Sequence, residues 1–322
     1  MKQARAGGQW SLSYCLLVLC LAAHAQVGAP SGGDTQKSQR PEATFRVNVR
    51  LVNVFATVTD EHGAPVAGLT KDDFSVFEDG FLQSIRVFGQ ESELPLSIAL
   101  AVDTSLSTQR DFKLEVASAK RFVHSIMRPV DHLAVFQVTE NIDQITGFSS
   151  DLKRIDQGID SLRIGAGTSL YDAIFLCSEA LIDREGRKVL VLITDGGDTT
   201  SSATYERALR RAQQAEAIVY SIIIVPVATE AGRNTGGEHA LIQISLDTGG
   251  KYYYAEGSER LEDAFRQIGI ELRTQYLLAY YSNRQTAAAP FRRLQVQVNR
   301  QDGDGKQYQV RHRAGYYTAP AK

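Results

Sequence analysis

The sequence has few of the residues that cross-link a small protein or bind soft metals. Its 322 residues include three cysteines and six histidines. Cys15 and Cys20 lie in an apolar N-terminal stretch, so removal of that stretch would leave Cys177 without a partner for an intrachain disulfide. Cys177 lies in an apolar, helical pattern, and we expect a buried, unreactive thiol there. The fold must therefore rest on its hydrophobic core.

Neither sign of charge is in excess. Lys and Arg number 35, and Asp and Glu number 37, which gives a formal net charge of −2. A protein that binds phosphate backbones needs a clustered basic face. We therefore expect no nucleic-acid partner.

The local motifs of several enzyme classes are missing. The chain has no Gly-x-Ser-x-Gly turn, no Gly-x4-Gly-Lys-Ser/Thr phosphate loop and no His-Glu-x-x-His helix. Its histidines are scattered without the spacing of metal ligands. We interpret the chain as a non-catalytic protein; a nucleophile and a base that meet only in space are the alternative left open.

The N-terminus carries an apolar run that is too short to span a bilayer, which takes about 20 residues. Two basic residues, the apolar run over 12–23 and the small-x-small pattern Ala23-His24-Ala25 are typical of a signal peptide. We predict a signal peptide over residues 1–25 and secretion across the inner membrane, to the periplasm, the cell surface or the medium. No membrane span remains after cleavage. An uncleaved membrane anchor is the alternative.

Residues 26–43 are polar and lack an apolar period, which is typical of a flexible linker. Residues 44–92 and 276–318 instead show short alternating strands separated by turn residues, with a last strand over Tyr308–Tyr317. Each of these β segments is too small to bury much surface alone. We predict that they pack together as one β-sandwich, with two independent β appendages as the alternative.

Residues 93–275 have a different pattern. Leu96–Val102 is almost continuously apolar, as expected for a strand buried on both faces of a parallel sheet. Helical and strand patterns then alternate as far as residue 272. We predict an α/β fold, with a doubly wound, mostly parallel, Rossmann-like sheet inserted between the two β-rich segments.

Oxygen-bearing side chains gather where the strands of this sheet are predicted to end. An Asp-x-Ser-x-Ser segment, residues 103–107, follows the first strand, and Thr-Asp-Gly, residues 194–196, follows a later one. Between them, a Gly-rich segment over 165–169 opens a helix. Ligand sites of open α/β sheets lie beyond the carboxyl ends of the strands, so the three segments are expected to meet at one edge. The candidate ligands are Asp103, Ser105, Ser107, Thr168 and Asp195.

These three segments, in this order, resemble the metal-ion-dependent adhesion site of von Willebrand factor type A domains, over residues 94–273. The flanking residues 68–80 and 315–317 are similar to the bacterial secreted "VWFA-related" proteins. The resemblance implies that Ser105 and Ser107 bind a metal through their hydroxyls and that Thr168 binds directly or through water. Asp103 and Asp195 would act mostly through water.

Hydroxyl and carboxylate oxygens suit a hard cation. Mg²⁺ prefers octahedral oxygen ligands and keeps several waters, and Mn²⁺ or Ca²⁺ are alternatives. Neutral hydroxyls supply little negative charge, so the ion stays able to attract a carboxylate from outside. The lack of His and Cys argues against zinc and copper. Taken singly, each segment is also a plausible helix N-cap, which is the alternative interpretation.

The sequence thus favours an exported, metal-dependent binding or adhesion protein that engages an Asp or Glu carboxylate of a protein partner. Two hypotheses from other classes stay open. One is an envelope scaffolding protein with a vestigial metal site. The other is a hydrolase that uses the metal as a Lewis acid.

Other acidic positions are expected to be structural. Asp302-Gly303-Asp304-Gly305 resembles part of a calcium loop, but Asp-Gly between two alternating strands is a hairpin turn signal. Asp172 and Asp198 lie near the predicted metal, and we expect structural roles for both.

Overall fold

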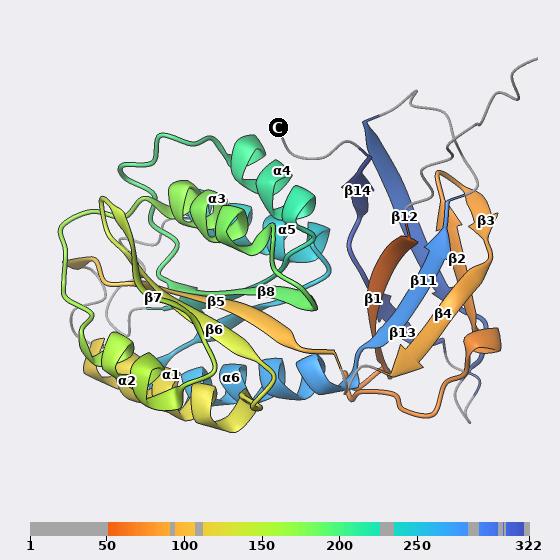
Figure 1. Ribbon diagram of the computed structural model, residues 1–322, viewed down its shortest axis with the longest axis horizontal. Helices are drawn as coiled ribbons and strands as arrows, with labels where there is room; N and C mark the ends of the chain where they lie inside the picture. Colours follow the sequence, from red (N-terminus) through yellow and green to blue (C-terminus); the bar gives the residue numbers. More distant parts are fainter. Residues whose placement is uncertain are drawn as a thin grey trace, which may run out of the picture. The chain divides into compact units, whose positions relative to one another are not determined.

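The computed structural model describes residues 51–90, 94–106, 112–225, 235–282, 290–301, 305 and 307–318 (Figure 1). All of them belong to one compact unit, Asn48–Lys322. The predicted signal peptide and linker, residues 1–25 and 26–43, lie outside the described residues. Across the described part of the chain, no helix combines the length and the apolar character needed to cross a membrane.

A six-stranded sheet forms the centre of the α/β region, in the order β10-β9-β8-β5-β6-β7. Its strands are parallel except for the edge strand β7, which runs antiparallel to β6. β5 is buried at every position, which accounts for its nearly continuous apolar sequence. The strands are β5 (Leu96–Asp103), β6 (His132–Val138), β7 (Ile142–Ser149), β8 (Arg187–Thr194), β9 (Ile218–Ile224) and β10 (Tyr252–Ala255).

Helices cover both faces of this sheet, and each face has its own core (Figure 1). One core joins the sheet to α1 (Phe112–Ile126), α2 (Leu152–Asp160) and α6 (Gly257–Thr274). The other joins it to α3 (Leu170–Leu181), α4 (Tyr205–Ala215) and α5 (Thr235–Asp247). Cys177 lies in the second core, and burial raises the pKa of its thiol, as expected for an unreactive cysteine.

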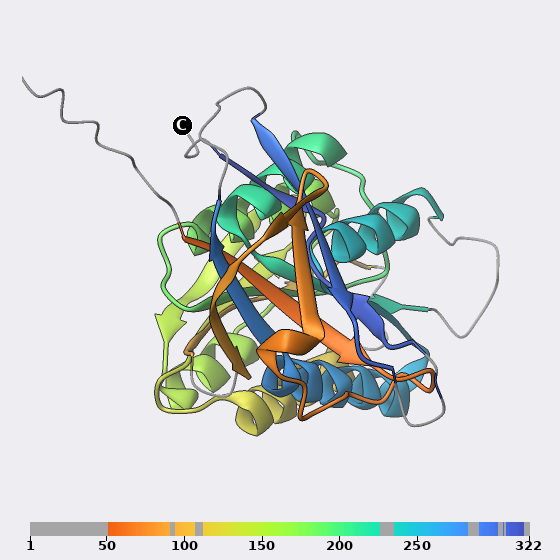
Figure 2. The same cartoon turned by 90° about the vertical axis from the view of Figure 1, so that its right-hand side faces the viewer.

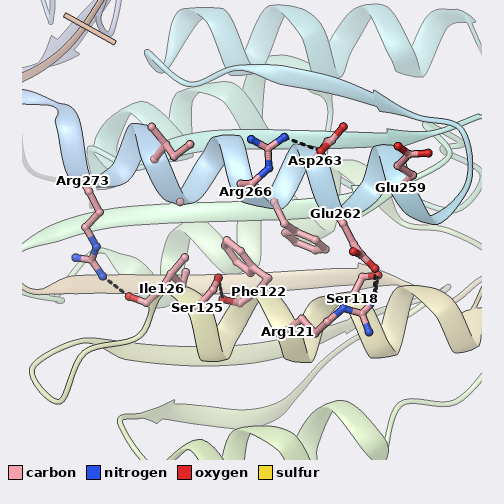
Figure 3. A pocket seen from close by; sticks show the side chains of 13 residues that line it. Ser118, Arg121, Phe122, Ser125, Ile126, Glu259, Glu262, Asp263, Arg266 and Arg273 are labelled. Carbon is pink, nitrogen blue, oxygen red and sulfur yellow. Dashed lines mark hydrogen bonds and ion pairs between the residues drawn. The ribbon is translucent and has the colours of Figure 1, made fainter. Parts of the chain in front are cut away.

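The helices α1 and α6 lie side by side and leave an open groove of about 510 Å³ between them (Figure 3). Phe122 and Phe265 stack at its floor, with ring centroids 4.5 Å apart. Arg121 of α1 pairs with Glu262 of α6 across the rim. The stacked rings pack the two helices against each other, whereas the ion pair is exposed and adds little.

The two β segments form a sandwich of two four-stranded sheets, in the orders β13-β1-β11-β4 and β14-β12-β2-β3. Both sheets mix strands from the two ends of the chain, as the interleaved orange and blue strands of Figure 2 show. Their inward side chains share one core. The strands are β1 (Leu51–Thr59), β2 (Phe74–Glu78), β3 (Phe81–Gln83), β4 (Ile85–Gln90), β11 (Tyr276–Tyr281), β12 (Phe291–Val298), β13 (Gln309–Arg311) and β14 (Gly315–Tyr317).

The predicted fold class is confirmed: a mostly parallel α/β sheet is inserted between two β-rich segments that complete one sandwich. The chain leaves the sandwich after β4 and returns to it in β11, directly after α6. β11 then pairs with both β1 and β4, so the returning segment fills the gap between strands from the first segment. The domain boundaries at residues 92 and 275 stay a prediction.

The prediction of one last strand over Tyr308–Tyr317 is wrong. The chain forms two short strands in different sheets, β13 beside β1 and β14 beside β12. Between these two strands the backbone passes the end of α5. The N–H of Ala314 donates to the carbonyl of Asp247 (2.9 Å), and Arg313 forms an isolated antiparallel β-bridge with Thr248. Apolar or aromatic residues keep one alternating register on both sides of this crossing, Tyr308 and Val310 before it and Ala314 and Tyr316 after it, so the period alone does not reveal it.

Arg187, the first residue of β8, is fully buried where the α/β region meets the sandwich. Its guanidinium donates to the carbonyl of Leu272 near the end of α6 and to Oε1 of Gln275 (3.0 Å). Gln275 donates through Nε2 to Oγ1 of Thr57 on β1 (3.1 Å). The guanidinium also lies over the ring of Phe55, 5.8 Å from its centroid. One buried cation therefore joins α6 to β1.

We expect Arg187→Ala to destabilise the fold strongly. The Leu272 carbonyl and the Gln275 side chain would each lose a donor in a buried place, which costs about 1–3 kcal/mol for each group. Denaturant titration measures this loss in the free energy of unfolding. The matched control is Arg266→Ala, since Arg266 is exposed and pairs with Asp263 at 2.6 Å. That variant should lose less than about 1 kcal/mol, and equal losses would show that Arg187 is not the joint.

Candidate metal centre

Asp103 is the last residue of β5, and it is fully buried. Its Oδ1 accepts a hydrogen bond from the backbone N–H of Ser105 (2.9 Å), the local turn that an aspartate makes with the chain two residues on. Its Oδ2 accepts from the hydroxyl of Thr194 at the end of β8 (2.7 Å). One buried carboxylate thus links the exits of two neighbouring strands.

Thr168 approaches the same carboxylate from the loop before α3. Its Oγ1 lies 3.5 Å from Oδ1 of Asp103. The N–H of Gly165 donates to the carbonyl of Thr104 (2.9 Å), which holds the start of this loop against the exit of β5. Thr199 holds it from the other side: its Oγ1 accepts from the N–H of Thr168 (3.0 Å), and its N–H donates to the Thr168 carbonyl (2.9 Å). The position of Thr168 is therefore set by backbone bonds on both sides.

Asp195 directly follows β8 and is half-buried. Its Oδ1 accepts from the N–H of Gly197 (2.9 Å). The intervening Gly196 has φ +85°, a conformation that favours glycine. A Cβ at Gly196 would also lie 3.2 Å from the backbone nitrogen of Glu238 in α5. Glycine here lets the chain turn at Asp195 while α5 packs closely against it.

Four of the five predicted ligands lie within the described residues. Asp103, Ser105 and Thr168 are buried, and Asp195 is close enough for its charge to act on Asp103. Ser107 lies outside the described residues. The structure thus gathers four of the predicted residues at the carboxyl edge of the sheet, and their roles as metal ligands stay a prediction.

The Asp103 carboxylate is costly to ionise. Burial raises the pKa of Asp103 from 3.8 to about 6, and the charge of Asp195 acts in the same direction. Hydrogen bonds from Thr194 and Ser105 oppose this rise. A cation beside the carboxylate would supply the charge that this environment lacks.

Residues 98–197 match the family model of the von Willebrand factor type A domain. The matched range begins in β5 and ends just after Asp195, so it includes all three segments of the candidate site. This chain contains a von Willebrand factor type A domain. The resemblance inferred from the three motifs is thereby confirmed.

Solved structures similar to the chain include several bacterial proteins. The conserved hypothetical protein BatB of Bacteroides thetaiotaomicron is 17% identical, over 55% of this chain and 97% of that one, with a TM-score of 0.45. The vWF domain of the type V pili tip protein Mfa5 of Porphyromonas gingivalis is 13% identical, over 55% and 94%, with a TM-score of 0.47. A von Willebrand factor type A protein of Catenulispora acidiphila is 16% identical, over 62% and 50%, with a TM-score of 0.49. No curated protein matches the chain.

The side chains at this edge of the type A domain fit a hard cation. The four described candidates offer hydroxyl and carboxylate oxygens, the ligands that Mg²⁺ prefers. No group of three His, Cys, Asp or Glu side chains that could hold a metal occurs in the part of the chain that the structure describes. A cation here would therefore depend on hydroxyls and water more than on carboxylates. The buried Asp103, whose pKa is raised, would gain most from its charge.

Sequence reasoning missed Glu140 and gave Thr194 no role. Oε2 of Glu140 accepts from the N–H groups of Ala166 (3.2 Å) and Gly167 (3.1 Å), just before Thr168. Backbone hydrogen bonds, including these two, lower the pKa of Glu140. The sequence does contain a signal for the role of Thr194, which stands at the end of an apolar strand beside Asp195. Glu140 had none, because it lies 26 residues from the loop that it supports.

Asp198 and Asp172 act on neighbouring backbone, in agreement with their predicted structural roles. Oδ1 of Asp198 accepts from the N–H of Leu170, the first residue of α3 (2.9 Å). The Asp172 carboxylate accepts from the N–H groups of Ser202 (2.8 Å) and Ala203 (2.7 Å). Of the predicted hairpin turn, residues 302–304 lie outside the described residues.

Asp103→Asn should abolish the part of the pH dependence of the unfolding free energy that Asp103 causes, when a chelator keeps metal ions away from the site. With a pKa raised from 3.8 to about 6, the folded protein binds more protons than the unfolded chain between these values. The contribution of Asp103 to stability therefore falls as pH rises from about 4 to 6, by about 3 kcal/mol in all. Denaturant titrations of both proteins across this range measure the difference. A difference that is constant with pH would contradict the raised pKa.

Glu140→Ala should loosen the loop before Thr168. Without the carboxylate, the amides of Ala166 and Gly167 lose their acceptor and should exchange with solvent about tenfold faster or more. Hydrogen exchange followed by NMR measures the rates, with the Thr168 amide, which bonds to Thr199, as the internal reference. Asp143→Ala, at an exposed acidic residue of β7, is the matched control. Unchanged rates in Glu140→Ala would show that Glu140 does not support the loop.

Proposed function

We propose that this chain is an exported, non-catalytic binding protein that engages a protein partner through a divalent cation in its type A domain. Mg²⁺ is the proposed ion, with Mn²⁺ and Ca²⁺ as alternatives. The residues that would hold it are Asp103, Ser105, Ser107, Thr168 and Asp195. The observation that carries the proposal is the buried Asp103 carboxylate, on which hydrogen bonds from three separate segments converge.

The chemistry of this edge favours an acidic partner. Because Ser105 and Thr168 are neutral, an ion held beside them keeps most of its positive charge. A partner's Asp or Glu carboxylate could then complete the coordination and neutralise the ion, where a cage of carboxylates would leave less attraction. Mg²⁺ exchanges some of its waters for such ligands while keeping octahedral geometry.

Two further observations support a binding role. The match to the type A domain includes all three segments of the candidate site, so they belong to the domain that would present the ion. The site also lies at the carboxyl edge of the sheet, where open α/β folds bind their ligands. Export is proposed from the signal-peptide pattern of residues 1–25.

Calorimetric titration of Mg²⁺ and of Mn²⁺ into the purified chain tests the metal site. We expect one ion to bind per chain, and Asp103→Ala to weaken binding at least about tenfold, since a lost charge-assisted contact costs more than about 1.4 kcal/mol. Asp143→Ala, at an exposed acidic residue outside the site, should bind as the unchanged chain does. Circular dichroism of each variant shows that it is folded.

Absence of binding in the unchanged chain would overturn the proposal. The five residues would then serve only as turns and helix caps, and a scaffolding role would take precedence. Metal-dependent turnover of ester or phosphate substrates that Asp103→Ala abolishes would instead favour a hydrolase.

A further inference from the structure

An aromatic ring of α3 lies against two arginines of the neighbouring helix α4 (Figure 1). The Cζ atoms of Arg207 and Arg211 lie 5.4 Å and 4.8 Å from the centroid of the Phe175 ring. The two arginines are four residues apart, so they share one face of α4, while Ala208 and Ala212 are buried against the core. One ring therefore contacts two guanidiniums on the outer side of these helices.

A third arginine of α4 extends this surface to the sandwich. The Cζ atom of Arg210 lies 5.8 Å from the centroid of the Tyr317 ring in β14. Tyr317 packs in turn against Phe291 of β12, with ring centroids 5.0 Å apart. We call these contacting rings and arginines the arginine face: Phe175, Arg207, Arg210, Arg211 and Tyr317.

Two arginines of this face have no anionic partner among the described residues. Arg207 and Arg210 are exposed, and neither forms an ion pair within the part of the chain that the structure describes. Nε of Arg211 lies 3.0 Å from Oε2 of Glu179 in α3, which leaves the terminal nitrogens of Arg211 for a second acceptor. A guanidinium that stacks on a ring keeps its N–H donors at its edge, where they can meet an anion.

From these contacts we propose that the arginine face binds an acidic segment of a protein partner, without a metal ion. Arg207 and Arg211 are about 6 Å apart along the helix axis, because each residue rises about 1.5 Å. In an extended peptide, alternate side chains point to the same side at a spacing of about 6.8 Å. An extended segment with Asp or Glu at alternate positions can therefore place one carboxylate on each guanidinium.

Stacking also favours this contact energetically. A guanidinium that already rests on a ring loses less freedom when it binds, and it can hold a carboxylate through two hydrogen bonds. The proposal goes beyond the metal-dependent function, because no residue of the arginine face is a candidate metal ligand.

A protein segment fits this face better than an anionic membrane surface does. Attraction to a membrane depends on summed charge, and Glu179 and Glu206 on the same two helices offset two of the three arginines. Leu176 directly follows Phe175 and is 43% exposed, so apolar contact is available beside the charges. Arginine and aromatic residues are the types enriched at protein–protein interfaces.

Three blocked tripeptides test the proposal: acetyl-Glu-Ala-Glu-amide, acetyl-Ala-Glu-Glu-amide and acetyl-Gln-Ala-Gln-amide. Each is titrated by NMR into the full chain at low ionic strength, after dialysis has removed metal ions. Glu-Ala-Glu should bind at least about tenfold tighter than Gln-Ala-Gln, which lacks carboxylates, and shift amide signals of α3 and α4. It should also bind about threefold tighter than Ala-Glu-Glu, whose neighbouring acids point to opposite sides.

The double variant Arg207→Gln, Arg211→Gln should bind Glu-Ala-Glu no better than Gln-Ala-Gln. The matched control is Lys153→Gln, Arg154→Gln, which removes the same charge from exposed positions of α2, on the other face of the sheet. It should bind as the unchanged chain does. Phe175→Leu keeps the charges but removes the ring, and it should weaken binding about threefold. Circular dichroism shows that each variant is folded.

Equal affinity for Glu-Ala-Glu and Gln-Ala-Gln would overturn the proposal. An equal loss in the control variant would also overturn it, because the attraction would then follow net charge alone. Equal affinity for Glu-Ala-Glu and Ala-Glu-Glu would contradict the extended segment. Cosedimentation with phosphatidylglycerol vesicles is measured in parallel. Vesicle binding that the Arg207, Arg211 variant loses, without any peptide binding, would replace the protein partner by a membrane surface. All these measurements exclude metal, so their failure is distinct from failure of the metal-dependent function.

Discussion

The arrangement of the candidate site depends on one buried carboxylate, that of Asp103. Its two oxygens accept from the Ser105 backbone, the Thr168 hydroxyl and the Thr194 hydroxyl, which come from three segments far apart in sequence. A carboxylate without these donors would not remain ionised in so buried a place, because desolvation favours its neutral form. The donors reduce this penalty without removing it, since the pKa of Asp103 still lies near 6. The sheet thus keeps a charge that is only partly compensated where a cation would compensate it further.

The strand β8 connects this edge to the opposite side of the α/β region. Its last residue, Thr194, bonds to Asp103, and its first residue, Arg187, bonds to the end of α6 and to Gln275. β8 is buried along nearly all its length between β5 and β9. One end of β8 therefore carries Thr194, which donates to the buried Asp103 carboxylate, and the other end carries the buried guanidinium of Arg187. The sandwich attaches at the cation end through Thr57 and Phe55, so the insertion of the type A domain rests on specific polar contacts as well as on apolar packing.

The sequence predicted those features that depend on local pattern. The continuous apolar run of β5 indicated a doubly buried strand, and the polar residues that follow two of the strands, with the loop that opens a helix, placed the three site segments at one edge. The alternation in β12 indicated a half-buried strand, although nothing local showed that Tyr308–Tyr317 crosses between two sheets. Contacts across long stretches of chain were beyond such reasoning. Glu140 supports a loop 26 residues away, and the bonds of Arg187 span 85 and 88 residues. The local sequence around an arginine at the start of a strand does not indicate whether its side chain is buried or exposed.

At the carboxyl edge of the sheet, buried polar positions stand directly beside exposed apolar ones. Leu106, which is exposed, directly follows the buried Ser105, and the exposed Ile164 directly precedes Gly165, whose N–H donates to the carbonyl of Thr104. The hydrogen bonds that Asp103 accepts come from the Ser105 backbone and from the hydroxyls of Thr168 and Thr194, and neither exposed side chain takes part in them. Substitution at the two exposed positions should therefore leave in place the buried carboxylate on which the candidate site depends.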